Sequence, residues 1–412
     1  MRAPPDGLQR RLGIFDAVVI GLGSMIGAGI FAALAPAARA AGSGLLLGLG
    51  VAAAVAYCNA TSSARLAARY PASGGTYVYG RERLGDFWGY LAGWGFVVGK
   101  TASCAAMALT VGSYVWPAHP HTVAVAAVLL LTAVNYVGVR KSAWLTRAIV
   151  AVVLTVLAAV VLACLTSTAS DPAHLDPGTT TGGVLEAAAL LFFAFAGYAR
   201  IATLGEEVRD PARTIPRAIP LALGIALAVY AAVAVAVLTV LGPTALGTAT
   251  APLADAVDQA GLPGLAPAVR VAAATAALGS LLALILGVSR TTLAMARDHH
   301  LPHALAAVHP RHKVPHRAEL TIGAIVAIMA ATLDLRGAIG FSSFGVLAYY
   351  AIANASAWTL TPTEGRPPRL VPIAGLIGCL TLAFALPLSS VITGAAVLAI
   401  GATLYALRRT AA

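Results

Sequence analysis

Two short segments of the sequence combine residue types that could hold a small zwitterion in apolar surroundings. Residues 21–31 read GLGSMIGAGIF, with four glycines in nine residues, and residues 192–200 read FFAFAGYAR. Each glycine weakens a continuous helix by about 1 kcal/mol relative to alanine, so both segments predict a helix interruption. An interruption exposes N–H groups at one half-helix start, which suit a carboxylate, and C=O groups at the other half-helix end, which suit an ammonium.

The elements that must position these segments are membrane-spanning helices. Of 412 residues, 59% are hydrophobic and only 10% are charged, which is too little polar surface for a soluble protein of this length. Apolar stretches of spanning length recur throughout, and helices satisfy their own backbone in lipid. We therefore predict an all-α membrane protein of about 12 transmembrane helices. The predicted spans are 13–38, 43–67, 86–115, 122–138, 144–166, 183–204, 218–241, 270–296, 318–334, 338–360, 370–387 and 389–407.

The net charge of +11 is distributed as a topology signal. Basic residues gather in alternate loops, and the opposite side of the predicted bilayer holds only Arg39, Arg270 and Arg336. The positive-inside rule then places both termini in the cytoplasm, and nucleic-acid binding is not predicted. Twenty-four arginines against three lysines are typical of a GC-rich bacterial genome, so we expect a bacterial plasma (inner) membrane.

The two unusual segments lie five spans apart, in the first and sixth predicted spans. An odd number of spans inverts the second unit in the bilayer, so the spacing predicts an inverted repeat whose broken helices meet near the midplane. The first repeat covers about 13–166 and the second about 183–360, with two additional helices at about 370–407, within one permease domain of residues 1–412. Close helix packing through small residues four apart remains the alternative explanation of the glycines.

The chain resembles the amino acid–polyamine–organocation (APC) superfamily of permeases over nearly its whole length. The stretches that carry the resemblance are GSMIGAGIF at 23–31, PASGGTY at 71–77, FFAFAGY at 192–198 with EEVRDP at 206–211 and IPRAI at 215–219, and SR at 289–290 with AMARD at 294–298 and LP at 301–302. The resemblance implies the leucine-transporter fold, a five-plus-five inverted repeat with two extra helices. It also implies alternating access. No cofactor is predicted, and no metal site either, because the spacing of the histidines fits no recognised ligand pattern.

The resemblance also places an amino acid between the first and sixth spans. It implies substrate contacts through backbone groups: amides around Ile26, Gly27, Ala28 and Gly29 for the carboxylate, and carbonyls of Phe193, Ala194, Phe195, Ser24 and Met25 for the ammonium, beside the sixth-span glycine Gly197. Phe193 is a candidate outer lid.

Two basic residues lie inside predicted spans, Lys100 and Arg200. A charge at such depth costs about 2.5–3.5 kcal/mol on insertion scales, so each should face a cavity or a partner. Some proton-coupled relatives carry a lysine in the fifth span, which here has no basic residue past Arg147. Lys100 or Arg200 could therefore replace a coupling cation or contact an acidic group on the substrate, and Lys100 is the candidate for coupling to protons. The alternative for either residue is that it snorkels to the interface or forms a structural pair with Glu186, Glu206 or Glu207.

The remaining gating candidates are Glu206, Glu207 and Arg290, which could form a gate-closing ion pair or a surface charge network. The predicted function is a secondary active amino acid transporter coupled to protons, with an exchanger, a uniporter or a membrane-embedded nutrient sensor as alternatives. An enzyme is not predicted, because no catalytic constellation shares one membrane depth. Basic residues in the cavity favour neutral or acidic amino acids over polycations.

Overall fold

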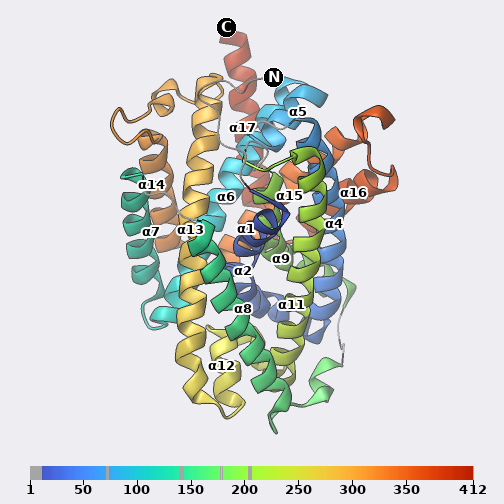
Figure 1. Ribbon diagram of the computed structural model, residues 1–412, viewed down its shortest axis with the longest axis vertical. Helices are drawn as coiled ribbons and strands as arrows, with labels where there is room; N and C mark the ends of the chain where they lie inside the picture. The colour runs from blue at the N-terminus through green and yellow to red at the C-terminus, as the bar shows by residue number, and fades with distance from the viewer. Residues whose placement is uncertain are drawn as a thin grey trace.

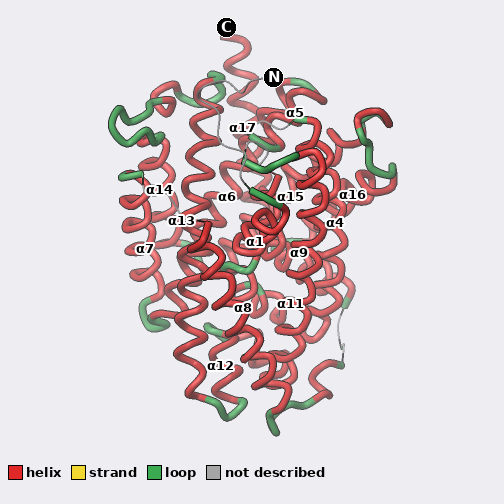
Figure 2. The backbone as a smooth tube through the Cα atoms, viewed as in Figure 1, coloured by secondary structure: helices red, strands yellow, loops and turns green. Residues whose placement is uncertain are grey.

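The computed structural model describes residues 12–70, 74–138, 143–176, 178, 180–202 and 207–411. These residues fold into a bundle of helices without a β-strand, as the tube in Figure 2 shows. An isolated β-bridge joins Leu12 to Val208. The helices are α1 (Ile14–Met25), α2 (Ala28–Ala32), α3 (Leu34–Ala41), α4 (Leu45–Arg69), α5 (Thr76–Leu84), α6 (Asp86–Val115), α7 (Pro120–Tyr136), α8 (Ala143–Thr166), α9 (Thr181–Phe195), α10 (Ala199–Ala202), α11 (Pro211–Thr248), α12 (Pro252–Gln259), α13 (Ala266–Arg297), α14 (His316–Thr332), α15 (Leu335–Trp358), α16 (Leu370–Ala385) and α17 (Leu388–Ala411).

The all-α membrane architecture predicted from composition is confirmed. Within the described residues, nine helical stretches are long and apolar enough to cross a membrane, and α7 and α16 are shorter apolar helices. The remaining predicted span coincides with α14, which has 17 residues. Each predicted span thus corresponds to helix, while the number of helices that cross the bilayer stays a prediction.

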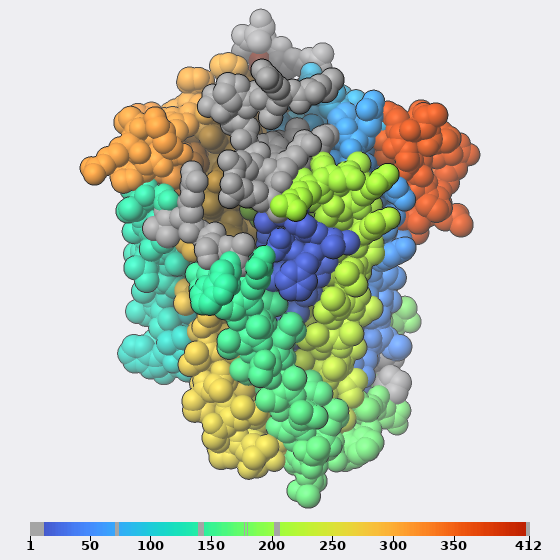
Figure 3. Space-filling model, in the orientation of Figure 1, coloured from blue at the N-terminus to red at the C-terminus, as the bar shows by residue number. Residues whose placement is uncertain are grey.

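The helices pack in two groups of four spans. In one group α1–α3, α4, α9–α10 and α11 contact one another, and in the other α6, α7, α13 and α14 do so. Helix α8 packs on α1, α11 and α13, and α15 packs on α4 and α6. Figure 3 shows part of α1 reaching the surface between α8 and α11.

The two ends of the bundle differ. In Figure 1 the C-terminal end of α17 lies at the same end of the bundle as α5, and we call this the terminal end; α12 lies at the other, distal end. At the terminal end Glu364 forms ion pairs with Arg83 (2.7 Å) and Arg69 (3.3 Å). Distally, α11 bends at Gly242, whose φ of 72° favours glycine, before Pro243.

Candidate functional site

The first predicted interruption is a break in the backbone between α1 and α2. Helix α1 ends at Met25, Ile26 has φ −81° and ψ 51°, and Gly27 has φ −104° and ψ −126°. The N–H of Ile26 still donates to the carbonyl of Leu22 at 2.6 Å. The helical hydrogen-bond pattern therefore stops over two residues and resumes at Ala28.

The second interruption takes a milder form. Helix α9 ends at Phe195 and passes through a 3₁₀ turn at Ala196–Tyr198 into α10. The backbone at both ends of this turn stays in the right-handed helical region. This segment is therefore tightened rather than unwound, which differs from the paired unwound segments that the glycines predicted.

The two interruptions cross at very short distances. A Cβ added to Gly197 would lie 2.3 Å from the carbonyl oxygen of Ser24, and one added to Gly29 would lie 2.6 Å from the Cα of Ala194. A Cβ on Gly27 would lie 2.2 Å from the hydroxyl of Ser280 in α13. The glycines therefore serve close packing as well as the break, so both explanations offered by the sequence describe part of the structure.

Several carbonyls at the crossing already have donors from the protein. The hydroxyl oxygen of Tyr230 in α11 lies 2.6 Å from the carbonyl oxygen of Met25 and 2.9 Å from that of Ala194, so these two carbonyls share its single proton. The hydroxyl of Ser280 donates to the carbonyl of Gly23 (3.1 Å). Sequence reasoning missed Tyr230 and Ser280, since a hydroxyl in an apolar span does not reveal which carbonyl it will reach. Two carbonyls expected to bind an ammonium therefore share one hydroxyl donor in this conformation.

A cavity of about 200 Å³ extends from the crossing toward the terminal end. Its lining includes Ser24, Phe193 and Gly197 at the crossing and residues of α5 at the far side. The predicted site residues that line it are Ser24, Phe193, Gly197, Lys100, Arg200, Glu207 and Arg290. The others lie at the crossing but outside this lining: Met25, Ile26, Gly27, Ala28, Gly29, Ala194 and Phe195. Phe96, Met107 and Leu284 give the cavity an apolar wall.

Lys100 is buried in α6, with 5% of its surface exposed, and faces this cavity. Its Nζ donates to the carbonyl of Ala196 in the 3₁₀ turn at 3.2 Å. In the described part of the chain no carboxylate lies within 4 Å of it, and Glu186 instead pairs with Arg336 at 2.5 Å. A structural pair between Lys100 and Glu186 is therefore excluded.

The other charged candidates lie toward the terminal end of the same cavity. Arg200, Glu207 and Arg290 all contribute to its lining. Of the ion pairs that the described residues form within 4 Å, none joins Glu207 to Arg290. Glu206 lies outside the described residues. The gate-closing pair with Arg290 therefore stays a prediction for another conformation.

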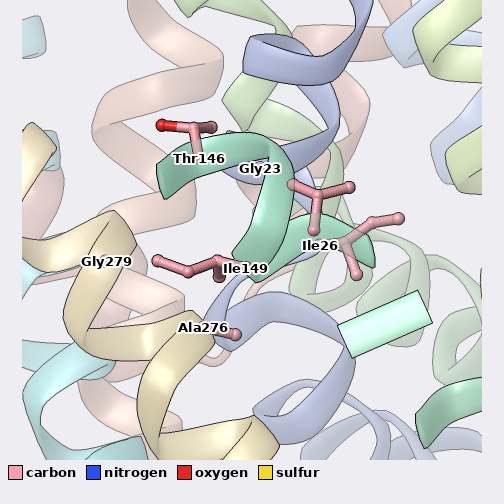
Figure 4. Close-up of a pocket in the computed structure, with 7 residues that line it drawn as sticks. Gly23, Ile26, Thr146, Ile149, Ala276 and Gly279 are labelled. Carbon is pink, nitrogen blue, oxygen red and sulfur yellow. The ribbon is translucent and has the colours of Figure 1, made fainter. Parts of the chain in front are cut away.

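Next to the break is a second, much smaller hollow. It measures about 10 Å³ and lies between α1, α8 and α13, where Figure 4 shows Gly23, Ile26, Thr146, Ile149, Ala276 and Gly279 around it. That volume is close to the minimum for one water molecule. Its α8 wall carries Thr146, Ile149 and Val150 and no basic residue, consistent with the absence of a fifth-span lysine in the sequence.

Comparison with known proteins decides the family. The family model described as "Amino acid permease" matches residues 16–365. The chain belongs to the amino acid permease family. The resemblance to the APC superfamily is thereby confirmed, and the protein is a multi-pass membrane transporter by family.

Named relatives extend over most of this permease. The "Uncharacterized transporter Rv1999c" of Mycobacterium tuberculosis is 77% identical over 407 residues, covering 98% of this chain and 92% of its own. The "Branched-chain amino acid permease BcaP" of Bacillus subtilis is 25% identical over 97% of this chain and 93% of its own. Human "Cationic amino acid transporter 4" is 30% identical over 88% of this chain and 61% of its own. The relatives thus include bacterial transporters, and the named substrates differ between them.

Proposed function

We propose that this permease is a secondary active transporter that moves amino acids across a bacterial plasma membrane by alternating access. The observation that carries the proposal is the cavity of about 200 Å³ that joins the crossing of the two interrupted spans to one end of the bundle. A transporter needs a site near the midplane that opens to one side at a time. The family match supports an amino acid as the substrate.

The proposed mechanism uses two inverted repeats, about 13–166 and about 183–360. The packing supports a two-fold relation, because three helices of the first unit contact their counterparts in the second: α4 with α11, α6 with α13, and α7 with α14. The fifth span of each unit packs on helices of the other unit. Helix α8 of the first unit packs on α11 and α13, and α15 of the second unit packs on α4 and α6. Such a pseudo-symmetric pair allows one conformation to open to each side.

The orientation that we propose has the terminal end in the cytoplasm, as the distribution of arginines predicts. The cavity then faces inward, and α12 with the distal loops covers the outer side. In the outward conformation the amides of residues 26–29 would receive the substrate carboxylate. The two carbonyls now bound by Tyr230 would have to exchange this donor for the substrate ammonium.

Proton coupling is assigned to Lys100 in this proposal. A buried ammonium without a carboxylate partner is costly, so gain and loss of its proton would respond strongly to the conformation around it. Its contact with the Ala196 carbonyl links the proton directly to the interrupted sixth span. The substitution Lys100→Gln keeps an N–H donor for that carbonyl and removes the charge.

The test uses purified full-length protein in proteoliposomes with an imposed pH gradient and a panel of labelled amino acids. We expect saturable accumulation that collapses with a protonophore, and we expect Lys100→Gln to lose accumulation while it still exchanges labelled for unlabelled substrate. Lys313→Gln, which removes the same charge from an exposed loop residue, is the control. Accumulation by Lys100→Gln equal to wild type would refute the coupling role, and no transport of any amino acid would refute the proposed function.

A further inference from the structure

A carboxylic acid is enclosed by the protein near the start of α14. Glu319 lies in the predicted span 318–334 and has 0% of its surface exposed. Neither of its carboxylate oxygens accepts a hydrogen bond from a described residue, and it forms no ion pair within 4 Å in that part of the chain. A buried carboxylate without such partners is costly, and the group avoids this cost by binding a proton. The surroundings of Glu319 therefore fit the neutral, protonated acid.

The side chains that could stabilise the ionised form come from the elements packed on α14. These elements are α6, α7, α13 and the 3₁₀ turn at His303–Ala306. Their charged and histidine side chains are Asp86 and Lys100 on α6, His121 on α7, Arg270, Arg290 and Arg297 on α13, and His303 on the turn, while α14 itself carries His316 and Arg317. Among these described residues, Arg290 is the one that acts on the charge of Glu319. The amide of Asn135 in α7 also lies close, but it donates to the carbonyl of Leu282 at 3.1 Å.

Arg290 connects this buried acid to the main cavity. It lines the cavity together with Glu207, and the like charge of Arg200 lies near it. In the described conformation Arg290 is within 4 Å of neither Glu207 nor Glu319. One guanidinium that approaches either carboxylate moves away from the other. The charge on Glu319 therefore affects how readily Arg290 reaches Glu207.

We propose that Glu319 is a protonation site that positions Arg290. With its proton bound, Glu319 is neutral and leaves Arg290 available to pair with Glu207 when the cavity closes at the terminal end. When the carboxyl O–H loses its proton to water, the carboxylate attracts Arg290 toward α14 and competes with Glu207. A rise in pH therefore slows closure of the cavity. The inference rests on the proposed function and adds to it a positioning residue and a dependence on pH.

A histidine gives the proton a route to the enclosed acid. His316 is the first residue of α14 and is partly exposed, and its buried Nδ1 has no hydrogen-bond partner among the described residues. Residues three apart on a helix are neighbours on one face, so His316 lies beside Glu319. An imidazole can accept a proton on one ring nitrogen and release one from the other.

A purely structural role for Glu319 makes a different prediction. A carboxylate in the first turns of a helix is favoured by the helix dipole, whatever Arg290 does. In that case Glu319 would stay ionised, and its charge would not change over the working range of pH. Glutamine has nearly the same shape as glutamic acid and stays neutral, so Glu319→Gln imitates the protonated acid permanently and separates the two roles.

The first experiment measures exchange of labelled for unlabelled amino acid in proteoliposomes, with equal pH on both sides, between about pH 5 and about pH 8. We expect wild-type exchange to fall at least about fivefold toward the alkaline end, and Glu319→Gln to keep the rate that wild type has at the acidic end. Because the variant is expected to be faster than wild type at high pH, a folding defect cannot imitate the result. Glu82→Gln removes the same group from an exposed position in α5 and should follow wild type.

A second experiment tests the protonation itself. Infrared spectra of the purified permease at neutral pH should contain the carbonyl band of a protonated carboxyl group, and this band should be missing from Glu319→Gln and present in Glu82→Gln. Identical spectra of wild type and Glu319→Gln at every pH would overturn the protonation site.

The failures of the two proposals are distinguishable. If Glu319→Gln and wild type have the same pH profile of exchange, the positioning role is overturned and the amino acid transporter stands. If wild type exchanges no amino acid at any pH, the positioning role fails together with the proposed function. The infrared result then still decides whether Glu319 binds a proton.

Discussion

The close crossing of the interrupted spans gives the sharpest quantitative prediction. In Gly197→Ala the new methyl group would lie 2.3 Å from the carbonyl oxygen of Ser24 and 2.7 Å from the amide nitrogen of Met25. Both are backbone atoms that cannot rotate away, so α1 and the 3₁₀ turn must separate by about 1 Å to restore ordinary contact. Overpacking of this kind costs about 1–3 kcal/mol.

That cost should appear in both stability and transport. We expect Gly197→Ala to lower the midpoint of thermal unfolding in detergent and to reduce uptake into proteoliposomes at least about fivefold, the factor that 1 kcal/mol corresponds to. Gly29→Ala, which places a methyl 2.6 Å from the Cα of Ala194 on the other side of the same crossing, should behave alike.

A matched control separates this effect from the general effect of adding a methyl group. Gly224 lies in α11 with no atom within 4 Å of a built Cβ. Gly224→Ala should therefore leave uptake unchanged and raise stability slightly, because alanine is the better helix former. Wild-type uptake and wild-type unfolding in Gly197→Ala would refute the close crossing, and with it the geometry on which the proposed site depends.

Three further changes test other contacts. Tyr230→Phe removes the one hydroxyl donor that two buried carbonyls share, so we expect a loss of about 1–3 kcal/mol in unfolding free energy, measured by denaturant titration. Hydrogen bonding from Arg83 lowers the pKa of Glu364 to about 2 from an ordinary value of 4.5. This pair therefore stabilises the fold above pH 4.5 and is lost as pH falls toward 2, and the thermal midpoint of Glu364→Gln should change less over that interval than that of wild type. In Tyr77→Phe the loss of the 2.5 Å hydrogen bond to Asp298 should increase the exchange of backbone amide hydrogens in α5. Unchanged exchange would contradict the idea that this contact stabilises α5.

Much of the fold follows from the sequence because lipid permits few solutions. The length of each apolar stretch predicts a spanning helix, and the glycines predict an interruption within residues 21–31. Helix ends were less predictable: the span expected at 218–241 begins in the structure at Pro211, within a charged segment. Here tertiary packing extends the helix beyond its apolar part.

The candidate site is only partly encoded in local pattern. Glycine content indicated the first interruption, and a single glycine in an aromatic-rich stretch indicated the second. Neither pattern could indicate that the second is a 3₁₀ turn that remains right-handed. The form of that turn depends on what touches it, and Lys100 supplies a hydrogen bond to its first carbonyl from a helix about a hundred residues earlier. Contacts between distant helices leave no pattern in a single sequence. A lysine inside an apolar span is visible there, and its burial cost predicts that it faces a cavity or a partner.

The distribution of donors at the crossing links the packing to the substrates that the site can accept. At the carbonyl ends of the interrupted spans the protein already supplies donors, from Tyr230 to Met25 and Ala194 and from Lys100 to Ala196. These contacts reduce the need for a cationic ligand at that end, although an ammonium is the group that free carbonyls would otherwise attract. A second cationic group on the substrate would also meet Lys100 in a medium that screens charge poorly. The same contacts that hold the interrupted spans together therefore oppose a substrate with a cationic side chain.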